Sequence, residues 1–391
     1  MGHGESRTAL WDVGEKAPTG VVSRGAGVTR PLPVRPWDVD AVSVSRVNGT
    51  TGRVREILDE TFTDAFAVVH KGDLLSEWYA EDGGPDRTHA VMSVTKGFVG
   101  CVAGLLLDRG ILEERGRVAH YVPELRASGY ADATVRDLLD MRSGVRFRED
   151  YADPTSDIRV MDEWLRGPRG LYEFLATLEA DRPHGGHFLY RSSETDVLGW
   201  VCERATGSPM TALVGELVWA PMGAEHDAEM LCDELGTAIH DGGLGATARD
   251  LLRFGLLLLE GGAVTEEGGE LRQVLPHRFL RHSWAVDADI RQAFMESAAE
   301  PSFPGGWYRN QFWFRVGPFG DVLLGLGIHG QLVYVSRRTH TVCVKLSSWP
   351  NAQQPAFLAD TLRACDALSG ALIGRDPAAH GHRVRGIVTG H

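Results

Sequence analysis

The most apolar helical pattern in the chain follows Lys96. Apolar side chains occupy nearly every position over residues 97–107, and Arg109 followed by Gly110 is typical of a helix end. A helix that is apolar on nearly every face is buried in the protein. We therefore predict a central buried helix, with Ser93 and Lys96 at its start.

Two apolar runs before this helix predict a β-hairpin. Residues 65–70 and 74–79 flank the turn Lys71-Gly72-Asp73, and such runs around a short turn that contains glycine form an antiparallel pair. In the last third of the chain the pattern predicts four short strands and a final helix, over residues 311–316, 321–326, 331–335, 341–348 and 355–371.

The middle of the chain has helical periodicity. Thr134 is typical of a helix N-cap, and the pattern predicts helices over residues 134–141, 171–179, 196–206 and 248–260. Strands at both ends and helices between them predict an α/β (α+β) fold, in which one antiparallel sheet flanked by helices is built from both ends of the chain and carries a helical insertion.

We expect the chain to have three parts. Residues 1–55 are expected to form an N-terminal arm that lies on the body through Trp11 and Trp37. Residues 56–115 and 245–391 are expected to form the α/β sheet domain, and residues 116–244 a mostly helical inserted domain. A chain of 391 residues is long enough to bury a large core in such an arrangement.

Composition narrows the class of partner. The net charge of −13 argues against nucleic acid and against an anionic membrane, because both bind basic surfaces. No apolar run reaches the length of a membrane span, and the first residues lack a secretory signal pattern. The five cysteines are odd in number and show no paired spacing, which is typical of reduced thiols. We expect a cytoplasmic protein.

Ser93 and Lys96 form a Ser-x-x-Lys pair, which is the first candidate for catalysis. The spacing places both side chains on one helix face, so an amine can take the proton of a hydroxyl nucleophile. Only four of the forty basic residues are lysines, which makes this lysine informative. The alternative is structural, with Ser93 as a helix N-cap and Lys96 as a solvated residue of the first turn.

Other patterns point away from cofactors. Residues 325–330 have the spacing of a dinucleotide-binding loop, but a predicted strand follows them where that loop needs a helix. No Gly-x-Ser-x-Gly occurs, which excludes the usual nucleophile elbow of α/β-hydrolases. Two histidine pairs lack partners at metal-ligand spacing: His184 with His187, and His380 with His382. We therefore expect no metal and no cofactor.

Four motifs in order connect the chain to a known superfamily. They are Ser93-Val94-Thr95-Lys96, the helix and stop at 134–144, Tyr190-Arg191-Ser192, and residues 242–251. In this order, over about residues 60–370, they resemble the serine β-lactamase and penicillin-binding-protein superfamily. The class C-like branch is most similar, and within it the 6-aminohexanoate-dimer hydrolases and related esterases, on residues 149–154, 325–331 and 344–350. The resemblance implies a β-lactamase/DD-peptidase-like fold.

The resemblance also implies a Ser-Lys-Tyr mechanism. Ser93 would attack an amide or ester carbonyl while neutral Lys96 takes its proton, and burial at the helix start would favour the neutral amine. Tyr190 would pass a proton to the leaving group and then help to activate the deacylating water. The backbone N–H groups of Ser93 and Ile328 would form the oxyanion hole. The alternative for Tyr190 is a loop tyrosine that packs against the next helix.

Five further residues are candidates for substrate binding. Tyr151 corresponds to an active-site tyrosine of the 6-aminohexanoate-dimer hydrolases, and the alternative is a surface aromatic residue. Asp162 and Asp241 match positions that line the pocket in that group, where acidic side chains would favour a substrate with an amine; the alternative is a solvated carboxylate. Arg191 would select an acidic or polar substrate, and His329 would line the cleft or cap its strand.

The departures from the superfamily limit the expected activity. Class C β-lactamases carry Tyr-x-Asn and Lys-Thr-Gly, whereas this chain has Tyr190-Arg191-Ser192 and, in place of the second motif, Gly325-Leu326-Gly327. The positive charge that grips a β-lactam carboxylate is missing, so we expect weak or no β-lactamase activity.

Three functions remain open from the sequence. The first is a hydrolase of small amides or esters. The second is a transacylase that passes the acyl group to an amine acceptor, because water exclusion and pocket shape decide between the two. The third is a catalytically silent binding protein on the same fold. In each case the expected partner is a small molecule, without nucleic acid or membrane.

Overall fold

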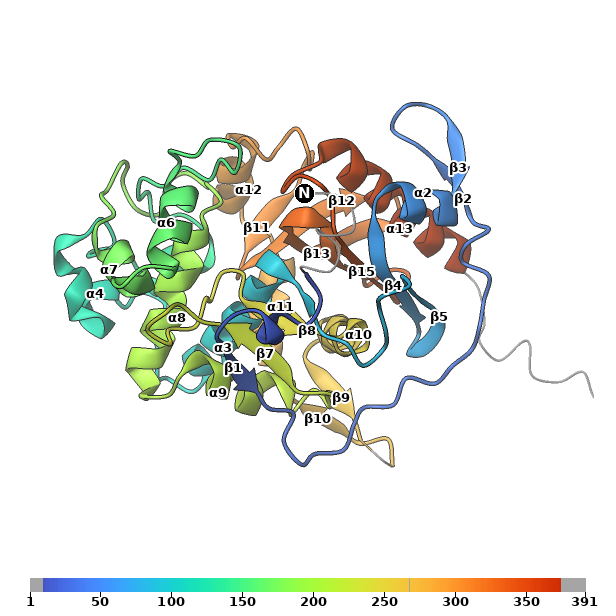
Figure 1. Cartoon of the computed structure of the whole chain (residues 1–391), viewed down its shortest axis with the longest axis horizontal. Coiled ribbons are helices and arrows are strands. Elements are labelled where there is room, and N and C mark those ends of the chain that lie inside the picture. Colours follow the sequence, from blue (N-terminus) through green and yellow to red (C-terminus); the bar gives the residue numbers. More distant parts are fainter. Residues whose placement is uncertain (1–9, 267, 374–391) are drawn as a thin grey trace, which may run out of the picture.

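The computed structural model describes residues 10–266 and 268–373 and centres on an antiparallel sheet of seven strands (Figure 1). Two strands come from before the central helix and five from the last third of the chain, in the order β11-β12-β13-β14-β15-β4-β5. Their bounds are β4 (Thr63–His70), β5 (Asp73–Tyr79), β11 (Trp307–Arg309), β12 (Phe312–Gly317), β13 (Gly320–Gly327), β14 (Gln331–Ser336) and β15 (Thr341–Ser347). The predicted mixed fold, with a sheet built from both ends of the chain, is confirmed.

Helices cover both faces of this sheet. Along β4, Ala65, Ala67 and Val69 belong to one hydrophobic core, while Phe66 and Val68 belong to another, because successive side chains of a strand point to opposite faces. The first core contains α3 (Thr95–Asp108) and α10 (Ala248–Leu259), and the second contains α2 (Val54–Glu60) and α13 (Pro355–Leu372).

The central helix α3 has the predicted position and burial. Every residue from Thr95 to Leu106 is buried, and Arg109 and Gly110 end the helix with Gly110 at φ 68°. A left-handed glycine is a common helix stop. The N-terminus of α3 therefore lies in the interior, where Lys96 has no access to bulk water.

A second sheet of four strands was not predicted. Its order is β1-β7-β8-β6, with β1 (Thr19–Val22), β6 (His89–Ala90), β7 (Ala228–Leu231) and β8 (Leu244–Ala246). Strand β6 leads directly to the Ser93 turn, and the Val91 N–H donates to the Leu244 carbonyl at 2.9 Å. The small sheet thus fixes where that turn begins. Two further hairpins pair β2 (Ser43–Ser45) with β3 (Thr51–Arg53) and β9 (Ala263–Thr265) with β10 (Leu271–Gln273).

The N-terminal segment contacts both parts of the molecule. Trp11 is buried with its ring edge-on to His89 at 4.7 Å, Trp37 packs against the second core, and β1 pairs with β7. The expected arm and the expected helical insertion therefore meet in one small sheet. The division of the chain into three parts stays a prediction.

The remaining helices outside the turns next to the site are η1 (Val13–Glu15), α4 (Val118–Tyr121), η3 (Pro123–Ala127), α5 (Val135–Leu139), α6 (Asp157–Leu165), α7 (Gly170–Ala176), α8 (Ser192–Thr206), α9 (Met210–Val214), η4 (Gly215–Trp219), α11 (His277–Trp284) and α12 (Ala288–Met295). Of these, α4, α6, α7 and α8 gather on one side of the molecule (Figure 1). Helix α8 is buried from Ser192 to Cys202 and packs on α3. Within residues 10–266 and 268–373, no helix combines the length and apolarity needed to cross a membrane.

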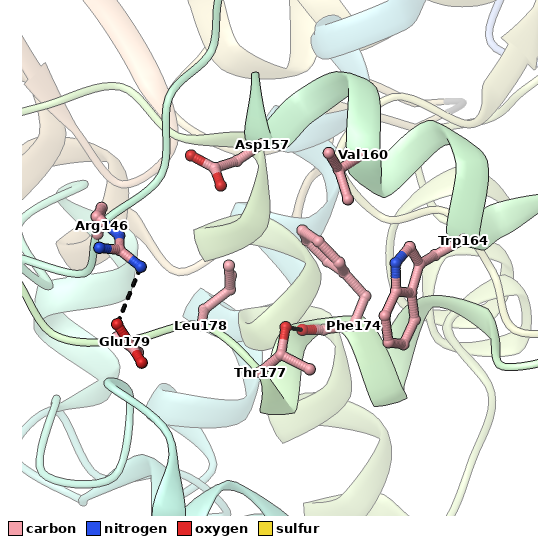
Figure 2. A pocket seen from close by; sticks show the side chains of 8 residues that line it. All are labelled: Arg146, Asp157, Val160, Trp164, Phe174, Thr177, Leu178 and Glu179. Carbon is pink, nitrogen blue, oxygen red and sulfur yellow. Dashed lines mark hydrogen bonds and ion pairs between the residues drawn. The ribbon is translucent and has the colours of Figure 1, made fainter. Parts of the chain in front are cut away.

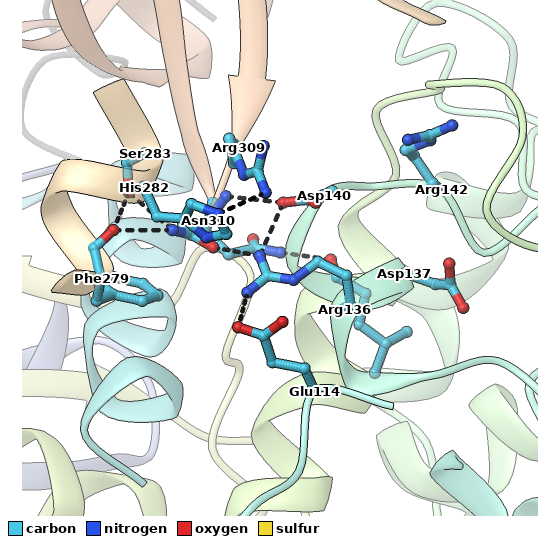
Figure 3. Close-up of polar contacts among 12 residues, drawn as sticks. Glu114, Arg136, Asp137, Asp140, Arg142, Phe279, His282, Ser283, Arg309 and Asn310 are labelled. Atoms are coloured by element: carbon cyan, nitrogen blue, oxygen red, sulfur yellow. Dashed lines mark hydrogen bonds and ion pairs between the residues drawn. The ribbon is translucent and has the colours of Figure 1, made fainter. Parts of the chain in front are cut away.

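A buried turn of the large sheet contacts α5 (Figure 3). Asn310 and Gln311, between β11 and β12, have φ values of 53° and 70°, which non-glycine residues rarely adopt. Arg136 donates to the Asn310 side chain and to Asp140, and the Asn310 N–H donates to Asp140 at 3.2 Å. These contacts hold β11 and β12, with Tyr308 and Trp313, against the site described next.

Candidate active site

The Ser93 turn is a strained segment between β6 and α3. Met92, in the 3-10 turn η2 (Met92–Val94), has φ 49°. The Thr95 hydroxyl donates to the Met92 carbonyl at 2.6 Å and accepts from the Leu244 N–H at 3.1 Å. Strained backbone of this kind persists where the surroundings fix it, and it clusters at functional sites. Ser93 lies in this turn before the helix, whose N-cap residue is Val94, so Ser93 does not have the structural role of an N-cap.

Lys96 points back at Ser93 from the first turn of α3. Its Nζ lies 2.9 Å from Ser93 Oγ, 3.1 Å from Ser192 Oγ, 2.8 Å from the Asp241 carbonyl and 3.4 Å from the Asp241 carboxylate. The side chain is 1% exposed. Lys96 is therefore not a solvated residue of the first helical turn, as the alternative interpretation had it. The Ser93–Lys96 pair has the geometry for proton transfer.

Tyr190 completes a cluster of three with Ser93 and Lys96. Its ring centroid lies 5.1 Å from Lys96 Nζ, and Ser93 and Lys96 both act on the pKa of its hydroxyl. The ring stacks on Trp313 at 5.0 Å and meets Tyr308 edge-on at 5.8 Å. Burial raises the pKa of Tyr190, while the Lys96 ammonium opposes that shift. The fold thus brings the three residues of the expected mechanism together.

Neighbouring acidic groups, Tyr190 first among them, decide the charge of Lys96. Burial alone would lower its pKa, but the negative charges that Tyr190, Asp241, Glu149 and Asp196 carry when ionised outweigh burial and raise it above the ordinary value. We expected burial to favour the neutral amine. The structure instead favours an ammonium at rest, because the same buried site holds several acidic groups.

Glu149 connects the site to the loop before α6. Its carboxylate accepts from the Ser192 N–H at 2.7 Å, from the Ser192 hydroxyl at 3.1 Å and from the Tyr151 hydroxyl at 2.9 Å. Burial raises the pKa of Glu149 and Lys96 lowers it. The sequence predicts no role for Glu149 or Ser192. Both lie in stretches that carry the resemblance, but a single carboxylate in a loop has no periodic signal.

Asp196 was also missed. It lies on α8, one turn after Ser192, and its carboxylate accepts from the backbone N–H groups of His240 and Asp241, both at 3.1 Å. Burial, and next to it the charge of Asp241, raises the pKa of Asp196 well above its usual range. Asp196 therefore holds the backbone whose carbonyl binds Lys96.

The candidate substrate residues differ in their distance from this centre. Asp241 contacts Lys96 directly, and Tyr151 is half-buried with its hydroxyl on Glu149. Asp162 is on α6, where it pairs with Arg159 at 3.1 Å and its side chain is 30% exposed. Burial raises the pKa of Asp162, and the charge of Asp241 adds to the shift. The charges of the two aspartates thus act on one another, while Arg159 and Arg166 oppose the effect on Asp162.

Arg191 has a different position from the one expected. Its side chain is buried, and its guanidinium donates to the Glu194 carboxylate and to the Leu189 carbonyl at 3.2 Å. Glu194 lies three residues later on α8 and holds the arginine side chain inside the protein. A direct contact of Arg191 with substrate does not fit this placement.

The end of β13 approaches the Ser93 turn closely. A Cβ added to Gly327 would lie 2.7 Å from the Val91 carbonyl and 2.9 Å from the Met92 Cβ, so only glycine allows this approach. Ile328, the next residue, is half-buried, and β13 contacts the turn η2. His329 has φ 59° and its Nδ1–H donates to the Trp349 carbonyl at 2.7 Å.

A separate hollow of about 200 Å³ lies between α6 and α7 (Figure 2). Its walls include Trp164 and Phe174 and the Arg146–Glu179 ion pair at 2.9 Å. None of the sequence-predicted site residues line it. Among residues 10–266 and 268–373, no group of three or more His, Cys, Asp or Glu side chains is arranged to hold a metal ion.

Comparisons with known proteins agree with this geometry. A family model described as Beta-lactamase matches residues 53–368. The chain is 36% identical over 380 residues to the 6-aminohexanoate-dimer hydrolase of Paenarthrobacter ureafaciens, covering 93% of this chain and 92% of that protein.

Two solved structures show the same fold. One, provisionally named a 6-aminohexanoate-dimer hydrolase, from Bacillus anthracis, has a TM-score of 0.82 at 25% identity and covers 93% of this chain and 94% of its own. A D-stereospecific amidohydrolase from Streptomyces sp. has a TM-score of 0.59 at 18% identity, over 80% of this chain and 97% of its own. The predicted superfamily is confirmed: the chain belongs to the beta-lactamase family.

Proposed function

We propose that the protein is a serine hydrolase that cleaves small amides or esters bearing an ammonium group, through an acyl-enzyme on Ser93. The observation that carries the proposal is the 2.9 Å contact between Lys96 Nζ and Ser93 Oγ, with the Tyr190 ring centroid 5.1 Å from the same Nζ. The 36% identity to a 6-aminohexanoate-dimer hydrolase supports an amide substrate.

Lys96 and Tyr190 act as one acid–base pair in this mechanism. Neutral lysine beside a phenol, and ammonium beside a phenolate, hold the same number of protons, and each form offers one basic atom to the Ser93 hydroxyl. Ser93 Oγ attacks the carbonyl carbon while the pair takes its proton. The pair then gives a proton to the leaving nitrogen or oxygen as the bond from the carbonyl carbon to that atom breaks.

The oxyanion of the tetrahedral intermediate is bound by two backbone N–H groups, those of Ser93 and Ile328. Water then attacks the acyl-enzyme, with the same pair as base and then acid, and releases Ser93. Acyl transfer to an added amine, detected as an amide product, would reassign the protein to the transacylases.

The electrostatics of the site favour a cationic substrate. The charges of Asp162 and Asp241 act on one another, and the Asp241 side chain is 11% exposed. The basic side chains near Tyr190 and β13 are not available to a substrate, since Arg191 is bound to Glu194 and Lys345 is buried on β15, where burial lowers its pKa. A carboxylate such as that of a β-lactam therefore has no favourable partner here, in line with the weak β-lactamase activity expected from the sequence.

Labelling with an alkyl fluorophosphonate tests the nucleophile. We expect one adduct per native chain, located by peptide mass spectrometry on Ser93, and no adduct on the neighbouring Ser192, which is held by Glu149. The heat-unfolded protein is the control and should stay unlabelled. A native protein that stays unmodified and hydrolyses no ester would favour the catalytically silent binding protein instead.

A matched pair of substrates tests the charge preference. The p-nitroanilides of 6-aminohexanoic acid and heptanoic acid have nearly the same shape and differ in the terminal ammonium. We expect kcat/KM to be at least about tenfold higher for the ammonium substrate, which corresponds to about 1.4 kcal/mol, and the ratio to fall as salt is added.

Asp162→Asn provides the matched variant for this preference, because Asp162 does not contact Lys96. The substitution is expected to lower the ratio of the two kcat/KM values while leaving heptanoyl hydrolysis within about twofold. Equal kcat/KM values for the two substrates in the native enzyme would contradict the ammonium preference.

A further inference from the structure

The turn Ile328–Gly330 between β13 and β14 is strained. His329 has φ 59° and Gly330 has φ 90°. Histidine is sterically disfavoured in the left-handed region, and such a conformation persists only where several surrounding contacts fix it. The first residue of this turn is the one whose N–H would bind the oxyanion, so what fixes the turn also fixes that donor.

One brace comes from the segment that follows β15. The His329 N–H donates to the Ala352 carbonyl at 2.9 Å, the Trp349 N–H donates to the His329 carbonyl at 3.2 Å, and His329 Nδ1–H donates to the Trp349 carbonyl at 2.7 Å. The Trp349 ring also covers Gly330, where an added Cβ would lie 2.3 Å from it. Three hydrogen bonds and one ring thus hold two residues of the turn.

A second brace is the side chain of Gln331, which is 1% exposed. Its Nε2 donates to the Ile328 carbonyl at 3.3 Å and to the Ser347 carbonyl at 2.7 Å, and its Oε1 accepts from the Ser347 N–H at 3.1 Å. The backbone pairing of β14 with β15 stops at Leu332 and Lys345. The glutamine amide therefore replaces the missing backbone pair and ties Ile328 to β15.

We propose that Gln331 is a positioning residue for catalysis, which, together with His329 and Trp349, holds the Ile328 N–H aimed at the oxyanion above Ser93. This inference rests on the proposed acyl-enzyme mechanism. Oxyanion donors act because they are already in place when charge develops, and a displacement of about 1 Å is enough to cost about 100-fold in rate. Gln331 does not contact Ser93. It acts through the backbone of Ile328, because it binds the carbonyl of the residue whose N–H is the proposed donor.

Gln331→Leu removes both sets of side-chain hydrogen bonds with little change in volume. We expect kcat to fall about 10- to 100-fold with KM within about twofold, because the oxyanion forms only after binding. Affinity for a tetrahedral inhibitor, a trifluoromethyl ketone of the same acyl chain, is expected to fall by the same factor as kcat/KM. A purely structural role would not make these two quantities fall together.

The matched control is Ser369→Ala, which removes a buried hydrogen bond of 3.2 Å to the Tyr334 hydroxyl in the same sheet and leaves the turn untouched. It is expected to change the melting temperature and to leave kcat and inhibitor affinity within about twofold. If Gln331→Leu does not fold, His329→Gly replaces it. Glycine relieves the left-handed strain and removes only the Nδ1 anchor, so the variant folds and still loses kcat and inhibitor affinity together.

The possible results distinguish the positioning role of Gln331 from the proposed acyl-enzyme function. A Gln331→Leu or His329→Gly enzyme with kcat and inhibitor affinity within about twofold of the native values would overturn the positioning role, while fluorophosphonate labelling on Ser93 would leave the proposed function standing. A native enzyme that shows no label on Ser93 overturns the proposed function first, whatever the variants do.

Discussion

Replacing Lys96 by methionine is expected to lower kcat/KM for ester and amide substrates by about 10³-fold or more, and replacing it by arginine is expected to cost nearly as much. General-base catalysis by a positioned side chain contributes about 10²- to 10⁴-fold. Methionine removes both the amine and its charge. Arginine keeps the charge, but its guanidinium stays protonated in proteins and cannot accept the Ser93 proton.

The two variants separate chemistry from electrostatics. Lys96 is the cation facing Asp241, Glu149 and Asp196 in the buried site. Methionine leaves these carboxyl groups uncompensated, and removing one partner of a buried charge pair typically costs about 3–5 kcal/mol of folding free energy. We therefore expect Lys96→Met to unfold at a clearly lower urea concentration, and Lys96→Arg to stay closer to the native midpoint while remaining inactive.

The pH profile of kcat/KM is the third measurement on the same variants. The pKa values of both Lys96 and Tyr190 are raised above their ordinary values, so the fully protonated pair is the resting form at neutral pH. Activity requires the loss of one proton from this pair, and kcat/KM of the native enzyme is expected to rise as the pH rises above neutrality. Native-like activity in Lys96→Arg would rule out Lys96 as the base.

The sequence predicts those helices and strands that depend on residues close together in the chain. The apolar periodicity of α3, the Lys71-Gly72-Asp73 turn between β4 and β5, and the last four strands of the large sheet all depend on neighbours in sequence. The small sheet β1-β7-β8-β6 has strands of two to four residues. Its strands pair residues as far apart as Thr19 and Leu231, and a run this short has no periodicity of its own.

In the candidate site, too, some features depend on neighbours in sequence and others on residues far away in the chain. Ser93 and Lys96 are visible in the sequence because their three-residue spacing is local. The charge of Lys96 cannot be inferred from its neighbours in sequence, since it depends on Tyr190 and on carboxyl groups from the loop before α6, from α8 and from the loop before β8. The burial of Arg191 was not predicted, because it depends on an ion pair with Glu194, three residues along the chain, that a motif of three residues does not contain.

The second large expected effect is a gain in stability when Lys345 is replaced by methionine. Lys345 lies on β15 with a fully buried side chain, and its Nζ donates to the Thr61 carbonyl at 3.2 Å and to the Ser347 hydroxyl, 5.5 Å from the Trp349 ring centroid. Burial lowers its pKa from the ordinary 10.5 to about 7, while the charges of Asp64 and Cys365 oppose the shift. The folded protein therefore disfavours the charged form of this lysine.

The sign of the pH dependence follows from this shift. Between pH 7 and 10.5 the unfolded chain binds the Lys345 proton and the folded protein does not, so this group makes the free energy of unfolding rise with pH, by at most about 1.4 kcal/mol per pH unit. At pH 7 and below, burial of the ammonium costs its full amount. Lys345→Met removes the titration, and methionine suits the apolar neighbours Phe66 and Leu332, which pair with this position.

We expect Lys345→Met to be more stable than the native protein by about 1–4 kcal/mol at pH 6.5, the range found when buried charges are replaced by apolar side chains. The difference should shrink steadily towards pH 9.5, where the native lysine is already neutral in the folded state. Urea unfolding of both proteins at several pH values measures it. Lys345→Arg is the matched control, since arginine stays charged throughout and should be destabilised without the same slope. Parallel profiles for the methionine variant and the native protein would show that Lys345 does not titrate in this range, because only a group that changes its protonation on folding can make the two curves converge.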